Sequence, residues 1–233
     1  MGKRIIQQAR GKGSLTYRVK KQAFNKTISY PKGTGEAEII AIIHSAAHSA
    51  PLAKIKLGKE ISYIPAFNQA FVEQKINIGE NVEIIPGNIL PIKNIPLGTE
   101  IYNIERNPGD GGKMIRTAGS AATILKKLEN NSVVLTMPNK KQVTLDPNCR
   151  AAIGRIAGDG RRLKPFAKAG KKYYKMKAKS KLWPRTSPIK VNAVDHPFGS
   201  GRGKRPKQKI AHRNAPPGQK VGHIRPRKTG YKR

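Results

Sequence analysis

Residues 36–64 read EAEIIAIIHSAAHSAPLAKIKLGKEISYI and contain three short runs rich in β-branched residues. The runs span 39–43, 53–57 and 61–64, and segments containing Ser, His, Pro or Gly separate them. Strands this short, spaced about ten residues apart, are typical of small antiparallel barrels rather than of alternating strands and helices. This stretch therefore predicts the beginning of a small β-barrel.

Similar runs continue almost to residue 156, with Gly, Pro and Asn between them. A weak helical period occurs only over residues 120–128. A spacer at 91–98 divides the runs into two groups of about 60 residues, each near the lower size limit for a domain. We predict a mainly β fold with two small β-barrels in tandem. The further runs are 72–78, 82–85, 101–104, 122–125, 133–137, 142–145 and 152–156.

Positive charge is concentrated at the two ends of the 233-residue chain, which has 47 Lys and Arg, 13 Asp and Glu and a net charge of +34. Residues 1–35 and 161–233 carry 33 of the cations and one acid, Asp195, whereas residues 36–160 carry 14 cations and 12 acids. A lone globule with so much charge would repel itself. A nucleic acid, with one phosphate charge per nucleotide, is the partner that this distribution favours.

The long basic ends contain few apolar residues and many Pro and Gly. Such segments cannot bury enough apolar surface to offset the entropy lost on ordering, so we expect them to be disordered in isolation and to order on RNA. Aromatic residues among the cations argue against a solubilising linker, because flat rings stack on unpaired bases. These aromatic residues are Tyr173, Tyr174, Trp183, Phe198 and Tyr231.

Neither a membrane segment nor an export signal is expected. The chain has no run of about 18 apolar residues, and its N-terminal Met1-Gly2-Lys3-Arg4 is not followed by the apolar core of a secretory signal. Cys149 is the only cysteine, so no intramolecular disulfide can form, and a reducing compartment fits. We expect a cytoplasmic protein.

A glycine-rich loop, Pro108-Gly109-Asp110-Gly111-Gly112-Lys113, superficially resembles a nucleotide-binding phosphate loop. That motif has four residues between its glycines and a Ser or Thr after the Lys, and neither holds here. Binding of a nucleoside triphosphate is therefore not expected. Two interpretations remain: a plain β-turn, or contact between backbone N–H groups and an RNA phosphate, helped by Lys113 and Arg116.

Two histidine motifs could suggest other chemistry. His44 and His48 have a spacing that can bind zinc on a helix, but the Ser and Pro residues around them indicate a strand end and a loop. Asp195 and His196 are adjacent, and a histidine could transfer protons. Sequence neighbours rarely form the required hydrogen bond, and no nucleophile pairs with them. We expect Asp195 to cap a turn and His196 to contact RNA.

Motifs along the whole chain resemble the universal large-subunit ribosomal protein two family, in its archaeal and eukaryotic form. They occur in the order of the family from end to end. They lie at residues 2–5, 11–13, 48–53, 86–88, 108–113, 118–119, 146–151, 168–171, 183–184, 192–199 and 213–218.

The resemblance implies an oligonucleotide-binding (OB)-like barrel followed by an SH3-like barrel, with long basic extensions at both ends. The corresponding division is a basic N-terminal extension at 1–35, an OB-like barrel at 36–96, an SH3-like barrel at 97–165, and a C-terminal extension at 166–233 that threads through rRNA. One departure from the family is visible, because Ser200 and Arg202 interrupt the glycine run of residues 199–203.

The resemblance also implies a structural constituent of the large ribosomal subunit, not an enzyme. Expected partners are large-subunit rRNA near the peptidyl transferase region, small-subunit rRNA at an intersubunit bridge, and neighbouring large-subunit proteins, with no membrane. No cofactor is expected, and Mg ions only as part of the rRNA environment. The alternative is a general nucleic-acid-binding or architectural protein, which the charge alone would permit.

His196 corresponds to a histidine of the family for which a direct role in peptide-bond formation was proposed and is disputed, since the centre itself is RNA. We interpret His196 as structural. We further expect Gly199, Gly201 and Gly203 to allow the backbone to approach RNA closely. The predicted rRNA-binding residues are Lys3, Arg4, Arg10, Lys12, Lys113, Arg116, Arg161, Arg162, Lys171, Lys172, Trp183, Asp195, His196, Gly199, Gly201, Arg202, Gly203 and Arg213.

Overall fold

The computed structural model describes residues 2–129, 132–200 and 210–224. The chain divides into two compact units. Residues 21–167 form one, which we call the β unit, and residues 1–20 and 168–233 together form the other, which we call the terminal unit. The two chain ends, expected as separate extensions, thus contribute to one unit, and residues 21–35 belong to the β unit.

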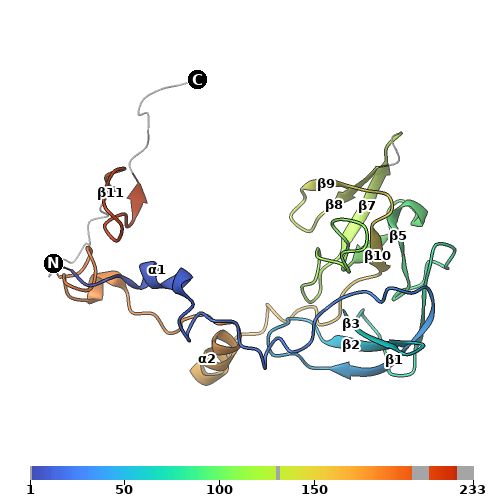
Figure 1. Ribbon diagram of the computed structural model, residues 1–233, viewed down its shortest axis with the longest axis horizontal. Helices are drawn as coiled ribbons and strands as arrows, with labels where there is room; N and C mark the ends of the chain where they lie inside the picture. The colour runs from blue at the N-terminus through green and yellow to red at the C-terminus, as the bar shows by residue number, and fades with distance from the viewer. Residues whose placement is uncertain (1, 130–131, 201–209, 225–233) are drawn as a thin grey trace. The chain divides into compact units, whose positions relative to one another are not determined.

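In the described part of the β unit, ten strands form one sheet in the order β3-β2-β1-β4-β5-β10-β6-β7-β8-β9 (Figure 1). Neighbouring strands are antiparallel except for β4 and β5. The prediction of a mainly β fold is therefore confirmed. The strands are β1 (Gly35–Ile43), β2 (Leu52–Leu57), β3 (Glu60–Pro65), β4 (Lys75–Ile78), β5 (Ile89–Pro91), β6 (Glu100–Tyr102), β7 (Ala122–Lys127), β8 (Val133–Thr136), β9 (Gln142–Leu145) and β10 (Arg150–Ile153).

The β unit has two hydrophobic cores that share strands. Successive side chains of a strand point to opposite faces, so Ile89 of β5 packs in the first core and Leu90 in the second. In β10, Ala152 belongs to the first core and Ala151 to the second. Figure 1 shows β7, β8 and β9 grouped with β5 and β10, and β1, β2 and β3 forming a second group. The central strands therefore form a common wall between the two cores.

Two local predictions are wrong. Residues 91–98 are not a spacer, because β5 ends there, the 3₁₀ helix η2 (Ile92–Asn94) follows, and Ile92 and Ile95 are fully buried in the second core. Residues 82–85 form no strand. In both cases long-range packing prevails over the local pattern. The run predicted at 122–125 is confirmed: it lies in β7 and pairs with β6 and β8, despite the weak helical period over 120–128.

The terminal unit has little apolar core: of its described residues only Ile5, Ala211 and Val221 are buried hydrophobics. Backbone contacts join its segments instead, since Lys3 N–H donates to Val194 O at 2.8 Å and Ser180 Oγ donates to Arg18 O at 2.6 Å. Its elements are α1 (Ile6–Ala9), η1 (Arg10–Lys12), α2 (Ala169–Ala178), η3 (Pro188–Lys190), β11 (Ile210–Ala211) and β12 (His223–Ile224).

The helix α2 lies in a segment for which no secondary structure was predicted. Its sequence, AGKKYYKMKA, is rich in Ala, Lys and Met, which are strong helix formers. It has no side-chain cap, and its C-terminal Lys179 N–H donates to Lys175 O. The segment thus has a good helix propensity, but its few apolar residues gave no helical pattern from which α2 could be predicted. None of the described helices is long and apolar enough to cross a membrane.

Candidate nucleic-acid interface

The two units differ sharply in charge. The terminal unit carries 27 Lys and Arg against a single acid, a net charge of +26 over 86 residues. The β unit carries 20 Lys and Arg against 12 acids, a net charge of +8 over 147 residues. The terminal unit therefore needs a polyanionic partner far more than the β unit does.

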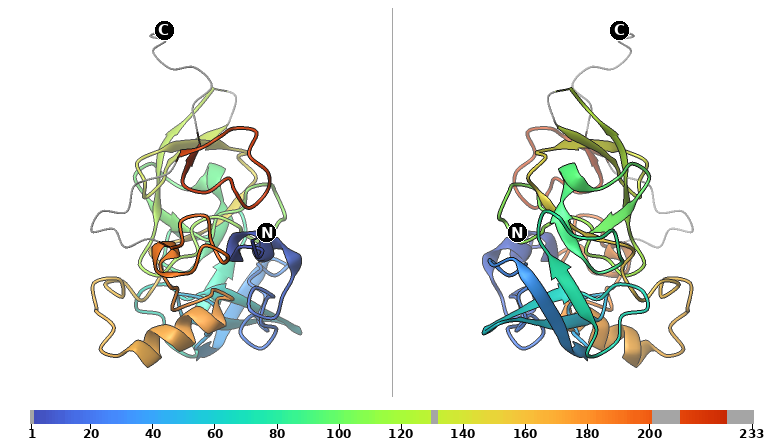
Figure 2. Two further views of the ribbon diagram at one scale, coloured as in Figure 1. Left: turned by 90° about the vertical axis from the view of Figure 1, so that its left-hand side faces the viewer. Right: turned by 90° about the vertical axis from the view of Figure 1, so that its right-hand side faces the viewer.

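In the terminal unit the N-terminal segment lies against the turn of residues 192–199 (Figures 1 and 2). The Asp195 carboxylate, expected to cap this turn, is instead 3.5 Å from Lys3 Nζ. The turn is closed by the backbone N–H groups of Asp195 and His196, which both donate to Asn192 O. Arg4 lies beside Lys3 and is exposed. The one acid of the unit therefore joins its two chain ends.

His196 is held by the backbone, not by Asp195. The Phe198 N–H donates to His196 Nδ1 at 3.0 Å, so the ring proton of the neutral imidazole lies on Nε2. The Phe198 ring packs edge-on against the imidazole with centroids 5.3 Å apart. Burial lowers the pKa of His196 below its ordinary value. The residue is thus a neutral, oriented donor with no carboxylate behind it.

Gly199 approaches the protein backbone closely, and its expected approach to RNA stays a prediction. A Cβ atom at this position would collide with the carbonyl of Asn192, and Gly199 is buried. Its N–H donates to His196 O at 2.8 Å. Glycine is therefore required here to close the turn around His196, independently of any contact with RNA.

Aromatic side chains lie among cationic side chains on and after α2. Lys172 Nζ lies 5.2 Å from the Trp183 ring centroid, a cation–π contact. Tyr173 and Tyr174 form an edge-to-face pair at 5.5 Å and are 43% and 69% exposed. Lys171 is exposed beside them. Exposed rings flanked by cations are suited to stacking on bases while the cations contact phosphates.

The glycine-rich loop of the β unit is held by carboxylates of the protein itself. The Gly109 and Gly111 N–H groups donate to the Glu105 carboxylate at 3.2 and 3.0 Å, and the Gly112 N–H donates to Asp110 at 2.9 Å. The loop donors are therefore already used by protein carboxylates. Lys113 remains exposed and available to a polyanion.

Glu105 is the centre of a buried network that no sequence signal identified. It is fully buried and accepts from the Arg150 backbone N–H at 2.9 Å and from its guanidinium at 3.0 and 3.2 Å. Arg150 also donates to Pro31 O at 2.9 Å. A buried carboxylate needs such a set of donors. The network thus ties three distant segments together around β10.

Arg116 also serves the fold. Its guanidinium donates to Asn103 Oδ1 at 3.1 Å and to Ile28 O at 3.2 Å. Burial lowers the pKa of Arg116. Much of its hydrogen-bonding capacity is therefore directed at protein. Arg161 and Arg162 lie in a fully exposed segment at the end of the β unit.

The remaining candidates are placed as follows. His48 Nδ1 lies 2.7 Å from Ser45 Oγ, and its ring packs against Phe24. Cys149 is buried, which raises its pKa to about 11 and keeps the thiol protonated. Arg10, Lys12 and Arg213 belong to the terminal unit. Gly201, Arg202, Gly203 and Tyr231 lie outside the described residues.

A modestly charged β unit joined to a polycationic unit with exposed rings defines a polyanion-binding protein without a recognisable active site in its described residues. Residues 85–218 match the family model described as Ribosomal Proteins L2, C-terminal domain. The chain therefore belongs to the ribosomal protein L2 family.

Full-length relatives agree with this assignment. The large ribosomal subunit protein uL2 of Archaeoglobus fulgidus is 47% identical over the whole of both chains. The protein of the same name from Methanococcoides burtonii is 45% identical over 99% of both chains, and that from Methanothermobacter thermautotrophicus is 40% identical over the whole of both. The resemblance found from the sequence motifs is thus confirmed.

Proposed function

We propose that this chain is a structural constituent of the large ribosomal subunit in the cytoplasm and binds large-subunit rRNA. The observation that carries the proposal is the terminal unit, in which both chain ends meet with a net charge of +26 and exposed aromatic rings. Such a unit gains stability when it releases counterions from RNA. The printed names of the relatives, large ribosomal subunit protein uL2, support this function.

The β unit is proposed to hold an OB-like barrel at 36–96 and an SH3-like barrel at 97–165. Of the extensions expected at 1–35 and 166–233, residues 21–35 and 166–167 belong to the β unit. The support is the presence of two cores, one centred on β1–β4 and the other on β6–β9. Because the cores share β5 and β10, the two barrels would behave as one rigid platform. The platform would carry Lys113, Arg161 and Arg162 toward rRNA.

The finer role that we propose is stabilisation of rRNA folding near the peptidyl transferase region and support of subunit association. Contacts with small-subunit rRNA at an intersubunit bridge and with neighbouring large-subunit proteins are part of this proposal. Membership in the family is its support. The exposed cations, which can neutralise phosphates on separate rRNA segments, are compatible with it.

We propose no catalytic role for this protein and no cofactor of its own, with Mg ions only as part of the rRNA environment. The support lies at His196: its Nδ1 accepts from Phe198, and Asp195 is directed to Lys3. His196→Gln should therefore impair subunit assembly more than peptide-bond formation by assembled particles. Normally assembled subunits that have lost peptide-bond formation by several orders of magnitude would overturn this assignment.

A competition assay tests the proposed function. The full chain is bound to labelled large-subunit rRNA at about 150 mM salt, with unlabelled large-subunit rRNA, small-subunit rRNA or duplex DNA as competitors. Nonspecific binding should be only about 10⁻⁴–10⁻⁶ M under these conditions. Preferential competition by large-subunit rRNA is expected. Equal competition by all three would instead favour a general nucleic-acid-binding protein.

A further inference from the structure

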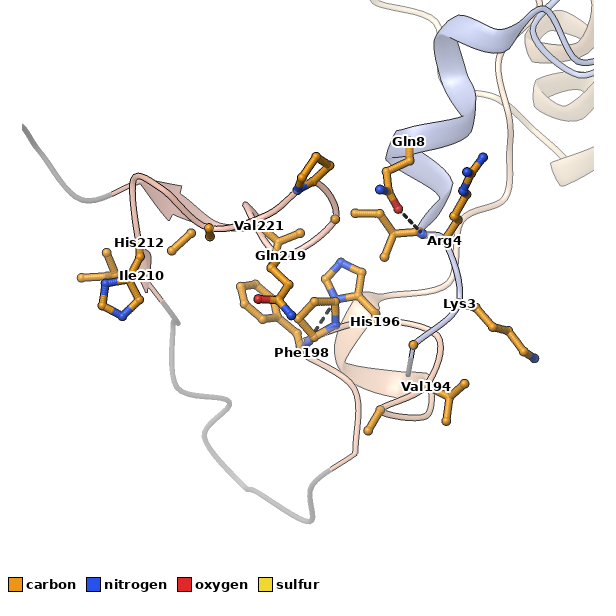
Figure 3. Close-up of a pocket in the computed structure, with 18 residues that line it drawn as sticks. Lys3, Arg4, Gln8, Val194, His196, Phe198, Ile210, His212, Gln219 and Val221 are labelled. Atoms are coloured by element: carbon orange, nitrogen blue, oxygen red, sulfur yellow. Dashed lines mark hydrogen bonds between the residues drawn. The ribbon is translucent and has the colours of Figure 1, made fainter.

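The terminal unit contains a pocket of about 540 Å³ that none of the predictions above included. Four stretches line it, within residues 2–8, 193–198, 210–212 and 215–221 (Figure 3). Its size lies within the range of about 300–1,000 Å³ that is usual for sites of small ligands. The pocket is thus built only when both chain ends come together.

The lining combines flat, apolar and hydrogen-bonding groups. Figure 3 shows His196 and Phe198 next to each other with Gln219 close by, while the side chains of Arg4 and Lys3 extend from the N-terminal segment at the edge of the pocket, away from the rings. Among the described residues the side-chain amide of Gln219 has no hydrogen-bond partner, so it can both donate and accept. The Nε2–H of His196 is a further donor, because Nδ1 is already used.

Several contacts hold the walls in place before any ligand arrives. Gln8 Oε1 accepts from the Ile5 N–H at 3.0 Å, which fixes the Gln8 side chain. Gly218, with φ +89°, lies so close to that side chain that a Cβ atom there would be 2.9 Å from Oε1. A side chain at position 218 would therefore press on Gln8 and change the N-terminal wall.

We propose that this pocket receives a single unstacked nucleotide of rRNA, with its base against the His196 and Phe198 rings and its phosphates near Arg4 and Lys3. The proposal rests on the rRNA-binding function proposed above. Proteins read unpaired RNA bases by stacking and by hydrogen bonds to the base edges. The rings and the Gln219 amide provide both, and the cations add phosphate contact. An acidic peptide would meet the cations but would leave the aromatic rings unused.

Two RNA hairpins that differ by one bulged adenosine test the proposal. The bulged position carries 2-aminopurine, whose fluorescence reports base stacking, and the full chain is titrated at about 150 mM salt. We expect the bulged hairpin to bind at least about five times more tightly, the lower end of what stacking on one aromatic residue contributes. Equal affinity for both hairpins would refute the pocket proposal yet leave rRNA binding intact. Failure to bind either hairpin would instead count against the proposed function.

A pocket-filling variant locates the binding site. Ala193 is exposed at the pocket, so Ala193→Leu adds bulk without altering charge. It should abolish the preference for the bulge and leave the affinity for the unbulged hairpin unchanged. Ala46→Leu, at an exposed alanine of the β unit, is the matched control and should keep the preference. A bulge preference that survives Ala193→Leu would place the base elsewhere.

A second variant and a competition experiment test whether the pocket reads the base and whether its ligand is RNA. Gln219→Leu removes only the amide of an exposed residue and should reduce the preference for the bulge at least about fivefold if this group reads the base edge. An unchanged preference in both pocket variants would refute the site even if Ala193→Leu misfolds locally. AMP at millimolar concentration should not displace the bulged hairpin. Full displacement by AMP would identify the ligand as a free nucleotide and overturn the assignment to rRNA.

Discussion

The β unit and the terminal unit reach order by different means. The β unit buries two apolar cores, and its buried charges, such as Glu105 with Arg150, are satisfied within the protein. The terminal unit has three buried hydrophobic residues among those described and is joined by backbone hydrogen bonds and one exposed ion pair. Burial of apolar surface is the main source of stability in water. We therefore expect the β unit to be stable by itself and the terminal unit to gain most of its order from its partner.

The contrast also indicates which residues serve RNA binding and which serve the stability of the fold. In the β unit, glycines and an arginine that looked like RNA contacts serve the fold, as the Glu105 loop and Arg116 show. In the terminal unit, cations and rings remain exposed. Substitutions of buried polar groups in the β unit should therefore change the free energy of unfolding, and substitutions of exposed cations in the terminal unit should change RNA affinity.

The largest effect is expected for Glu105→Ala. The change leaves Arg150 and two loop N–H groups without their acceptor in a buried site. Removing one member of a buried ion pair costs about 3–5 kcal/mol in unfolding free energy. Urea denaturation of the full chain, followed by far-UV circular dichroism, measures it. Glu100→Ala is the control, because the Glu100–Arg155 pair is largely exposed and should contribute less than about 1 kcal/mol. Similar losses in both variants would contradict the internal role of Glu105.

The same contrast explains which parts of the fold could be predicted from the sequence. Alternating apolar residues in 53–57 identified β2, because that pattern encodes which face is buried. The run at 61–64 identified β3 but not its buried face, since Ile61 is exposed and Ser62 is buried. Of the two strands shared by the cores, β10 was predicted in part by the run at 152–156, whereas β5 was missed. All three residues of β5 are buried, so the strand shows no alternation of apolar and polar residues. Glu105 was missed because one acid in a sequence reveals nothing about distant donors.

The candidate site was predicted in part for a similar reason. Cations and rings in the terminal unit follow from composition, and the comparisons confirmed the family. The pocket wall was not predictable, because Gln8 and Gln219 become relevant only through contacts across more than 200 residues. The pairing of Asp195 with Lys3 rather than with its neighbour His196 was likewise not predictable, because it forms only when the two chain ends come together.

A smaller effect is expected from Gly199→Ala. The added Cβ atom collides with the Asn192 carbonyl, and overpacking of this kind costs about 1–3 kcal/mol. Hydrogen exchange of the Ser200 amide, which donates to Val191 O, reports opening of the turn. Gly170→Ala is the matched control, because nothing lies within 4 Å of its would-be Cβ in α2 and the change should stabilise the helix by about 0.4–1 kcal/mol. Unchanged exchange at Ser200 would show that the turn is not closed as described.

Neutralising one exposed cation should have a smaller effect still. Lys171→Gln removes one phosphate contact and should reduce the slope of log affinity against log salt by about 0.9. Binding to large-subunit rRNA over a salt series measures the slope. Lys75→Gln in the β unit removes the same charge from a lysine paired with Glu36 at 2.8 Å and should leave the slope unchanged. Equal slopes for Lys171→Gln and the unchanged chain would remove α2 from the RNA interface.

The smallest effect concerns pH and the turn around His196. Its pKa lies below the ordinary value because burial disfavours the charged ring, and protonation of Nδ1 would break the bond from the Phe198 N–H. The folded state therefore binds this proton less readily than the unfolded state. The contribution of His196 to stability is complete above about pH 6.5, the unfolded value, and is lost as the pH falls toward the folded pKa.

NMR titration of the His196 ring, together with exchange of the Phe198 amide, tests this linkage. The midpoint should lie below about 6.5, and Phe198 exchange should accelerate beyond its intrinsic pH dependence as the ring becomes protonated. Lys3 and Asp195 form an ion pair at this turn. The variant Lys3→Gln therefore shows how much this pair, rather than burial, contributes to the pKa of His196. In His196→Gln the extra pH dependence should disappear. A midpoint above the ordinary value would mean that a carboxylate, not burial, governs His196, and would reopen the comparison with a proton-transferring pair.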